Sequence, residues 1–185
     1  GKAEGFSRGI ERSYHYGHFD EAAGISHVGM ISHLGAMIPV AAGCAFAMKR
    51  NGGDRVAINF IGEGGTSTGD FHEAMNLAAV WKLPLVLVIE NNRYAMGTSV
   101  TRSSAQTDFS KRGISFNIPG KQVDGMDVRA VKAAGDEAVA WCRGGNGPFI
   151  LEMQTYRYRG HSMSDPAKYR TREEVEKIRT DQDPI

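Results

Sequence analysis

The chain has 185 residues, enough for one ordinary domain with an apolar core, and we expect a single domain over residues 1–185. Its 22 basic and 21 acidic residues leave a formal charge of +1, which gives no reason to expect nucleic acid or a membrane surface as a partner. Cys44 and Cys142 are too few for a disulfide framework and read as small buried apolar residues. The longest uncharged apolar stretch, residues 34–48, is too short to span a bilayer and shows no targeting signal, so we expect a buried helix there in a soluble protein.

Helical and strand patterns alternate along the chain after a start rich in Gly, His and Tyr. That start, residues 1–32, has no lasting period and predicts a loop with at most a short strand. The patterns that follow predict a buried helix over 35–50, a strand over 55–61, an amphipathic helix over 68–81 and a buried strand over 85–89. After a long polar connection over 93–121, they predict a short strand over 120–125, a helix over 128–143 and a strand over 149–153. A basic loop over 156–170 then leads to a charged helix that opens at Thr171, with Glu174 at the capping-box position. This alternation predicts an α/β fold with a doubly wound, mostly parallel sheet, in which ligands bind outside the carboxyl ends of the strands.

Two polar clusters follow consecutive predicted strands. Gly62-Glu63-Gly64 ends the first strand, and Asn91-Asn92 ends the next after twenty-six intervening residues. Glycines let the backbone approach a diphosphate closely, and carboxylate and amide oxygens are the ligands that Mg²⁺ prefers. Either half alone is more often only a turn or a loop cap. Their joint occurrence at two neighbouring strand ends predicts a site where a metal ion bridges a diphosphate to the protein.

The same residues resemble a known family. The two clusters and their spacing are similar to the thiamine-diphosphate motif, and Glu90 to Tyr94 with Gly97-Thr98-Ser99 resembles the alpha subunit of pyruvate dehydrogenase. Further similar segments are 81–84, 123–127 and 154–166, the last of which reads QTYRYRGHSMSDP. The resemblance covers the chain from about Ser32 onward. It implies the thiamine-diphosphate-binding fold and the alpha subunit of a thiamine-diphosphate-dependent 2-oxoacid dehydrogenase.

The resemblance also implies roles for individual positions. Glu63 and Asn92 would bind Mg²⁺ through their side chains and Tyr94 through its carbonyl. The residues implied to contact the cofactor are Ser32 and Leu34 on its aminopyrimidine half and Gly62, Gly64, Gly65, Asn92, Arg157 and His161 on its diphosphate side.

The basic loop of this family closes over diphosphate and substrate. The resemblance implies that Arg157 and His161 lie on this loop and that His161 is catalytic, assisting acyl transfer to a lipoyl group. Ser162 and Ser99 match positions that are phosphorylated in some members of the family. Arg170, Arg172 and the two glutamates after it read as a solvated helix start.

The implied reaction is oxidative decarboxylation of a 2-oxoacid with acyl transfer to a lipoyl carrier protein. The implied partners are a beta subunit, in an α₂β₂ assembly, and the lipoyl-bearing acyltransferase of the complex. Glu63, where the family more often has aspartate, favours a branched-chain 2-oxoacid, whereas segments 90–99 and 154–166 favour pyruvate; acetoin is also open. We expect bacterial cytoplasm or mitochondrial matrix as location, and a domain that lacks the family's N- and C-terminal extensions.

Two other interpretations stay open. Gly65-Thr66-Ser67-Thr68-Gly69 matches the G-x-S-x-G pattern of a serine hydrolase, in which Ser67 would be the nucleophile and His161 the base. An elbow turns directly off its strand, however, and here Gly62-Glu63-Gly64 intervenes. The second interpretation is a catalytically silent assembly fragment of the same fold. No G-x-G-x-x-G or Walker A pattern occurs, which argues against a nucleotide-binding domain of those types.

Overall fold

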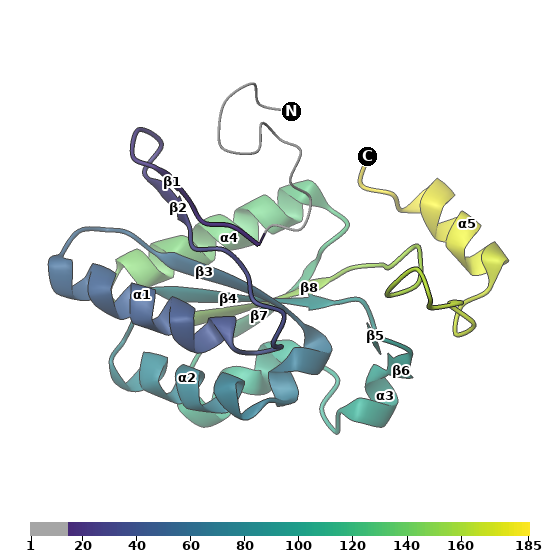
Figure 1. The fold of residues 1–185 in the computed structure, drawn as a ribbon, viewed down its shortest axis with the longest axis horizontal. Helices are drawn as coiled ribbons and strands as arrows, with labels where there is room; N and C mark the ends of the chain where they lie inside the picture. Colours follow the sequence, from purple (N-terminus) through teal and green to yellow (C-terminus); the bar gives the residue numbers. More distant parts are fainter. Residues whose placement is uncertain (1–14) are drawn as a thin grey trace.

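A computed structural model describes residues 15–185 of the chain. Its centre is a four-stranded sheet in which every pairing is parallel. In spatial order the strands are β3 (Ala57–Gly62), β4 (Leu85–Asn91), β8 (Phe149–Gln154) and β7 (Gly120–Asp124). Figure 1 shows helices α1 (Met37–Asn51) and α2 (Gly69–Val80) on one face of the sheet and α4 (Val128–Arg143) on the other. This arrangement confirms the predicted doubly wound α/β sheet.

The continuous apolar run of β4 is buried on both faces of the sheet. Leu85, Leu87 and Ile89 pack into the core cluster formed with α1 and α2, whereas Val86 and Val88 pack into the cluster formed with α4. Successive side chains of a strand point to opposite faces, so an unbroken apolar run fits only a strand covered by helices on both sides.

The neighbouring strand β3 is covered on one face only. Its residues alternate between buried and exposed, and the exposed Ile58 and Phe60 belong to the face away from α1. Helix α1 packs on the other face through a stripe of small residues: Ala41, Ala42 and Ala45 are all buried. Within residues 15–185, no helix has the length and apolar character needed to cross a membrane.

Two regions predicted as loops contain regular structure. Near the start of the described chain, β1 (His18–Asp20) and β2 (Ile25–His27) form an antiparallel hairpin. The connection over 93–121 was predicted as long and polar, with no helix or strand located in it before residue 120. It contains β5 (Tyr94–Ala95), β6 (Thr98–Ser99), the short α3 (Val100–Ser103) and the 3₁₀ segment η2 (Phe109–Phe116), whose Phe109 is completely buried in the α1–α2 core.

The last helix, α5 (Arg172–Asp181), lies beyond the carboxyl ends of the strands with β5, β6 and α3 (Figure 1). The hydroxyl of Thr171 accepts a hydrogen bond from the backbone N–H of Glu174 at 3.1 Å, which confirms the predicted N-cap. The Glu174 carboxylate does not return to Thr171; it accepts a hydrogen bond from the Tyr156 hydroxyl at 2.9 Å. The helix start is therefore tied to the preceding loop.

Candidate functional site

The polar clusters of the sequence meet at one edge of the sheet. In the strand register Gly62 lies beside Glu90, and Asn91 lies beside Gln154. The backbone N–H of Thr155 also donates to the Asn91 carbonyl at 3.0 Å. Three neighbouring strands thus end together, which confirms the predicted meeting of the two clusters.

Glu63 is the most unusual residue at this edge. It opens the 3₁₀ segment η1 (Glu63–Ser67), its side chain is only 2% exposed, and its Oε1 atom has no hydrogen-bond partner in the part of the chain that the structure describes. Burial raises the pKa of the Glu63 carboxyl, whereas the backbone N–H groups of Glu63 and Asn92 and the positive charge of Arg157 act to lower it. Burying a carboxylate oxygen without a partner is costly, so this oxygen is suited to a ligand with positive charge.

The two glycines after Glu63 pack too closely against their neighbours to be replaced by larger residues. A Cβ atom placed on Gly64 would lie 2.6 Å from the Cβ of Ala95, and one on Gly65 would lie 2.7 Å from Cδ1 of Ile61. Both distances are shorter than real Cβ contacts, so neither position accepts a side chain without movement of its neighbours. The absence of side chains therefore lets the η1 turn lie directly against β5 and the end of β3.

Two threonines, Thr66 and Thr68, close the η1 turn, a role that the G-x-S-x-G pattern containing them does not predict. The Thr66 hydroxyl donates to the Glu63 carbonyl at 2.6 Å, and the Thr68 hydroxyl donates to the Gly65 carbonyl at 2.9 Å. Thr66 is completely buried. The only sequence signal for this role is their i+3 spacing from the carbonyls that they cap.

Asn92 and Tyr94 lie on either side of a left-handed residue, Arg93, whose φ is 75°. The Asn92 Oδ1 atom accepts a hydrogen bond from the backbone N–H of Tyr94 at 3.3 Å. The carbonyl of Tyr94 accepts one from Nη2 of Arg157 at 3.1 Å. A carbonyl oxygen has two lone pairs, so this contact leaves it a second position for a metal ion.

Two arginines of the loop that follows β8 fasten it to this turn. Arg157 donates to the carbonyls of Tyr94 and Met96, the latter at 3.0 Å. Arg170 donates to the Asn92 carbonyl at 2.7 Å and to the carbonyl of Arg157, and its guanidinium lies 4.1 Å from the ring centre of Tyr156. The interpretation of Arg170 as a solvated helix start is therefore wrong. The Arg170 guanidinium also lies over the rings of Tyr94 and Tyr169, and of these partners only Tyr169 is adjacent in the sequence, so residue pattern carries no clear signal for this role.

His161 lies at the exposed tip of the same loop. Its backbone N–H donates to the Asp165 carboxylate at 2.8 Å, and the Tyr169 hydroxyl donates to the same oxygen at 2.8 Å. The His161 N–H is the largest of several donors that lower the pKa of Asp165. The Ser162 hydroxyl pairs with that of Ser164 at 3.0 Å. The loop tip is thus organised by Asp165 while the His161 side chain faces solvent.

Leu34 and Ser32 occupy the segment before α1. Leu34 is 74% exposed, and its Cβ lies 4.0 Å from the position that a Cβ on Gly65 would take, so it borders the glycine turn. Ser32 lies on the exposed chain and shares a hydrogen bond of 3.2 Å with His15 Nε2. The structure therefore brings Leu34 to the strand-end site and leaves Ser32 further along the segment.

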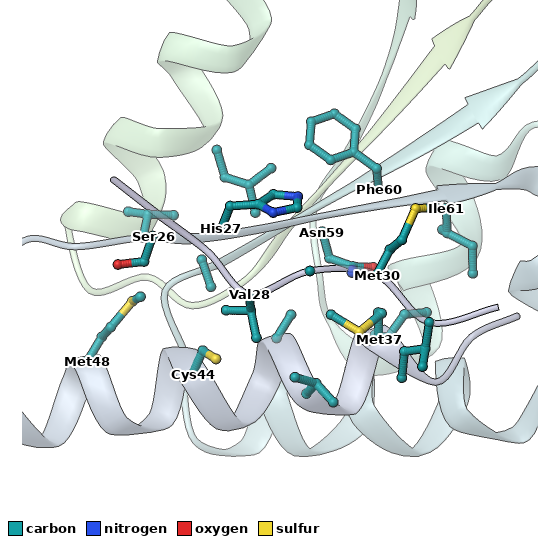
Figure 2. Close-up of a pocket in the computed structure, with 18 of the residues that line it drawn as sticks. Ser26, His27, Val28, Met30, Met37, Cys44, Met48, Asn59, Phe60 and Ile61 are labelled. Atoms are coloured by element: carbon teal, nitrogen blue, oxygen red, sulfur yellow. The ribbon is translucent and has the colours of Figure 1, made fainter. Parts of the chain in front are cut away.

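Beside Leu34 a mostly apolar groove of about 1270 Å³ runs between this segment, α1 and β3. Figure 2 shows Val28 and Met30 of the segment above Met37 and Cys44 of α1, with the Asn59 side chain among them. The groove extends to Gly62 and Glu90, so it opens next to the strand-end site.

The serine of the G-x-S-x-G pattern is poorly placed for a nucleophile elbow. Ser67 is exposed at the far end of the five-residue η1, whereas an elbow serine sits directly on the turn that leaves the strand. The first residue after the strand is instead the buried Glu63. Within residues 15–185 no three His, Cys, Asp or Glu side chains gather in a metal-binding group.

The fold and this edge define an α/β protein with a ligand site at the carboxyl ends of parallel strands. The sequence pattern of the dehydrogenase E1 component family matches residues 5–185, and the chain belongs to that family.

Curated relatives agree with this family. The chain is 56% identical over 189 residues to the pyruvate dehydrogenase E1 component subunit alpha of Rhizobium meliloti, an alignment that covers 100% of this chain and 52% of the relative. It is 48% identical over 185 residues to the protein of the same name from Zymomonas mobilis, covering 100% and 51%. The somatic, mitochondrial human form is 54% identical over 153 residues, covering 82% and 39%. The chain thus spans about half the length of the bacterial relatives it matches.

Proposed function

We propose that this chain forms the cofactor-binding part of the alpha subunit of a thiamine-diphosphate-dependent pyruvate dehydrogenase. The observation that carries the proposal is Glu63: a buried carboxylate with an unpartnered oxygen, next to two glycines that exclude side chains and to the turn that holds Asn92. Family membership and the names of the relatives support the same assignment.

The donor set fits a magnesium diphosphate. Glu63 and Asn92 would hold Mg²⁺ through side-chain oxygens and Tyr94 through its carbonyl, all of them hard oxygen ligands. Gly62, Gly64 and Gly65 would let the backbone reach the diphosphate, and Leu34 and Ser32 would contact the aminopyrimidine half. When bound, thiamine diphosphate supplies the electron sink that decarboxylation of a 2-oxoacid requires.

The loop of residues 155–171 supplies the remaining groups. Arg157 donates to the Tyr94 carbonyl, on the turn that would hold the metal ion, and a guanidinium there would stabilise a diphosphate. His161 would then lie over the substrate and hold or transfer a proton during acyl transfer to the lipoyl group. Water would be excluded when the loop packs over the site.

We further propose a beta subunit and the lipoyl-bearing acyltransferase as partners, and pyruvate, before a branched-chain 2-oxoacid, as substrate. The relatives named above are pyruvate dehydrogenase subunits, and this supports pyruvate although Glu63 stands where aspartate is commoner. Bacterial cytoplasm or mitochondrial matrix is the proposed location. Ser162 and Ser99 are exposed or half-buried hydroxyls, which suits phosphorylation.

The experiment is calorimetric titration of thiamine diphosphate into the full-length subunit assembled with its beta partner, with Mg²⁺ and again with EDTA. We expect binding that requires Mg²⁺ and that weakens by at least about 100-fold in Glu63→Ala, because even residues behind metal ligands typically contribute 10- to 100-fold in affinity. Glu73→Ala is the matched control, since Glu73 is an exposed carboxylate on α2.

Binding that survives EDTA, or that Glu63→Ala leaves unchanged, would contradict the metal-bridged site. A folded assembly that binds no thiamine diphosphate at all would favour the silent assembly fragment. Labelling of Ser67 by a fluorophosphonate would favour the serine hydrolase.

A further inference from the structure

A buried carboxylate behind the site has no part in the function proposed so far. Glu152, in the middle of β8, is completely buried and accepts hydrogen bonds from the Asn91 side-chain amide at 2.7 Å, from the backbone N–H of Ser110 at 2.9 Å and from the Gln122 side chain at 3.1 Å. Within residues 15–185 no arginine or lysine forms a salt bridge with it. The carboxylate of Asp108 lies beside Glu152 and accepts from both the N–H and the hydroxyl of Ser110, and its interaction with Glu152 is among the causes that lower the pKa of Asp108.

The side chain of Asn91 connects Glu152 with the site. Asn91 is completely buried, and its Nδ2 group donates to Oε1 of Glu152. Its Oδ1 atom, at the other end of the amide, accepts from the backbone N–H of Arg93 at 3.0 Å. An amide has a donor end and an acceptor end, so an acceptor at Glu152 forces the Asn91 oxygen to face Arg93.

Arg93 is the left-handed residue between Asn92 and Tyr94. A left-handed conformation is unfavourable for a residue with a Cβ and persists only where contacts hold it. The hydrogen bond from its N–H to Asn91 is one such contact. The geometry of this turn decides where the Asn92 oxygen and the Tyr94 carbonyl lie.

We propose that Glu152 is a positioning residue for the metal turn, residues 91–94: its carboxylate fixes the amide orientation of Asn91, and Asn91 in turn holds Arg93. The identity of the ligand at Asn92 and Tyr94 rests on the proposed function. The hydrogen-bond chain itself involves only described residues and is testable without cofactor.

Swapping the amide of Asn91 and the carboxylate of Glu152 tests whether Glu152 fixes the orientation of the Asn91 amide. In Glu152→Gln, the remaining oxygen is needed by Ser110 and Gln122, so the new NH₂ group faces Asn91 and turns its amide over. The NH₂ group of Asn91 then meets the N–H of Arg93, two donors without an acceptor between them. In Asn91→Asp, two carboxylate oxygens face each other instead.

The double variant Glu152→Gln with Asn91→Asp restores every contact. The carboxylate introduced at position 91 accepts from the amide at position 152 and from the N–H of Arg93, while the oxygen at position 152 still accepts from Ser110 and Gln122. The number of charges and of side-chain atoms is preserved. A residue that merely fills the core would show no such reciprocal rescue.

The measurement is hydrogen exchange of the Arg93 amide in the full-length subunit assembled with its partner, without cofactor. We expect each single variant to raise the exchange rate about tenfold, the usual worth of one hydrogen bond. The double variant should return it to within about threefold of the wild type. The Mg²⁺ concentration for half-maximal binding of thiamine diphosphate should rise by about 10- to 100-fold in the single variants and recover in the double variant.

Two further variants test the proposal if swapping the amide and the carboxylate between positions 91 and 152 prevents folding. Asn91→Ala removes the connection to Arg93 and should raise the exchange rate like Glu152→Gln. Gln122→Ala removes a Glu152 partner on its other side, at an exposed position, and should leave the Arg93 amide protected. Equal effects of these two variants, or a double variant no better than the singles, would overturn the proposal. A wild-type assembly that protects Arg93 but binds no thiamine diphosphate would overturn the proposed function and leave the positioning role standing.

Discussion

The two halves of the site are built in different ways. The strand-end half, from Glu63 to Asn92, is an extension of the core: Glu63, Thr66 and Asn91 are all at least 98% buried, and neighbouring strands fix their backbones. The loop half, residues 155–171, is mostly exposed or half-buried and is held to the turn by the side chains of Arg157 and Arg170. Under the proposed function, this difference would give rigid preorganisation to the half that holds the metal ion and reversible attachment to the half that meets the substrate.

The proposed function would require such a division. A metal site gains affinity when its ligands are already in place, because no ordering remains to be done on binding. A loop that covers a substrate must open again, and regions that move are held by few buried apolar contacts. Hydrogen bonds from arginine side chains to carbonyl oxygens hold such a loop in place. When the loop opens, water can take over these hydrogen bonds.

The largest effect should come from weakening that attachment. Arg170→Lys keeps the charge but loses the planar fork that reaches the Asn92 and Arg157 carbonyls, at a local cost of about 2 to 4 kcal/mol for two charge-assisted bonds. We expect hydrogen exchange over residues 156–170 to rise at least about 30-fold, while the strand ends stay protected. Arg172→Lys, at an exposed position on α5, is the matched control. Equal protection in both variants would show that the loop is held by something other than Arg170.

A smaller effect is expected where a side chain invades the strand-end half. Gly64→Ala places a methyl group 2.6 Å from the Cβ of Ala95, which cannot rotate away, so the free energy of unfolding should fall by about 1 to 3 kcal/mol. Binding of thiamine diphosphate should weaken with it. Gly135→Ala in the interior of α4, where a methyl group meets nothing within 4 Å, should instead gain about 0.5 to 1 kcal/mol. Urea unfolding of both variants measures the contrast, and a neutral Gly64→Ala would show that the turn yields.

The sequence located the strands of the strand-end half and the extent of the loop after β8, but not the contacts that hold this loop, for a physical reason. Buried strands and amphipathic helices impose periods on the sequence, so the helix over 128–143 and the strands around Glu63 and Asn91 could be located from residue pattern alone. The metal motif added the spacing of two strand ends. The prediction of one domain over residues 1–185 stays a prediction.

The sequence did not predict hydrogen bonds between side chains and residues far away along the chain. Arg170 bonds to Asn92 across 78 positions and Glu152 to Asn91 across 61, and neither contact leaves a period in the sequence. Glu152 sits inside an apolar strand, where a charged residue signals a buried polar network, but its partners come from three other segments. The burial of Phe109 could not be predicted from the sequence for the same reason, because its core contacts depend on how the 93–121 connection folds back.

Removing a helix cap should have a smaller effect, and that effect should differ between α4, which packs on the core, and α5, which follows the loop half. Asp127 caps α4 through the N–H groups of Arg129 at 2.8 Å and Ala130 at 3.2 Å, and Thr171 caps α5. Either cap is worth about 1 kcal/mol, but α4 packs on the sheet whereas α5 has no buried residue. Asp127→Ala should therefore lower the Tm by about 2 to 4 °C, and Thr171→Ala should only speed hydrogen exchange in α5. An equal loss of Tm in both variants would mean that α5 unfolds together with the core.

The smallest effect concerns the stability of the cofactor-free protein and its dependence on pH. Because burial raises the pKa of Glu63 above its value of 4.5 in an unfolded chain, the folded state binds the proton more tightly than the unfolded state does. The wild type should then lose stability as the pH rises from about 4.5 through the raised folded-state pKa. Glu63→Gln has no such titration, so its stability relative to the wild type should grow across that window and level off above it.

Thermal unfolding of the two proteins between pH 4.5 and 8, without Mg²⁺ and thiamine diphosphate, measures this difference. Other carboxyl groups titrate alike in both proteins and cancel in the comparison, and Glu73→Gln provides the exposed control. Adding Mg²⁺ and thiamine diphosphate should make the wild type the more stable of the two proteins, because it gains binding free energy that Glu63→Gln lacks. If the stability difference between the wild type and Glu63→Gln does not change with pH, the Glu63 carboxylate is not destabilised by burial, and the argument for a strand-end site built on its unpartnered oxygen fails.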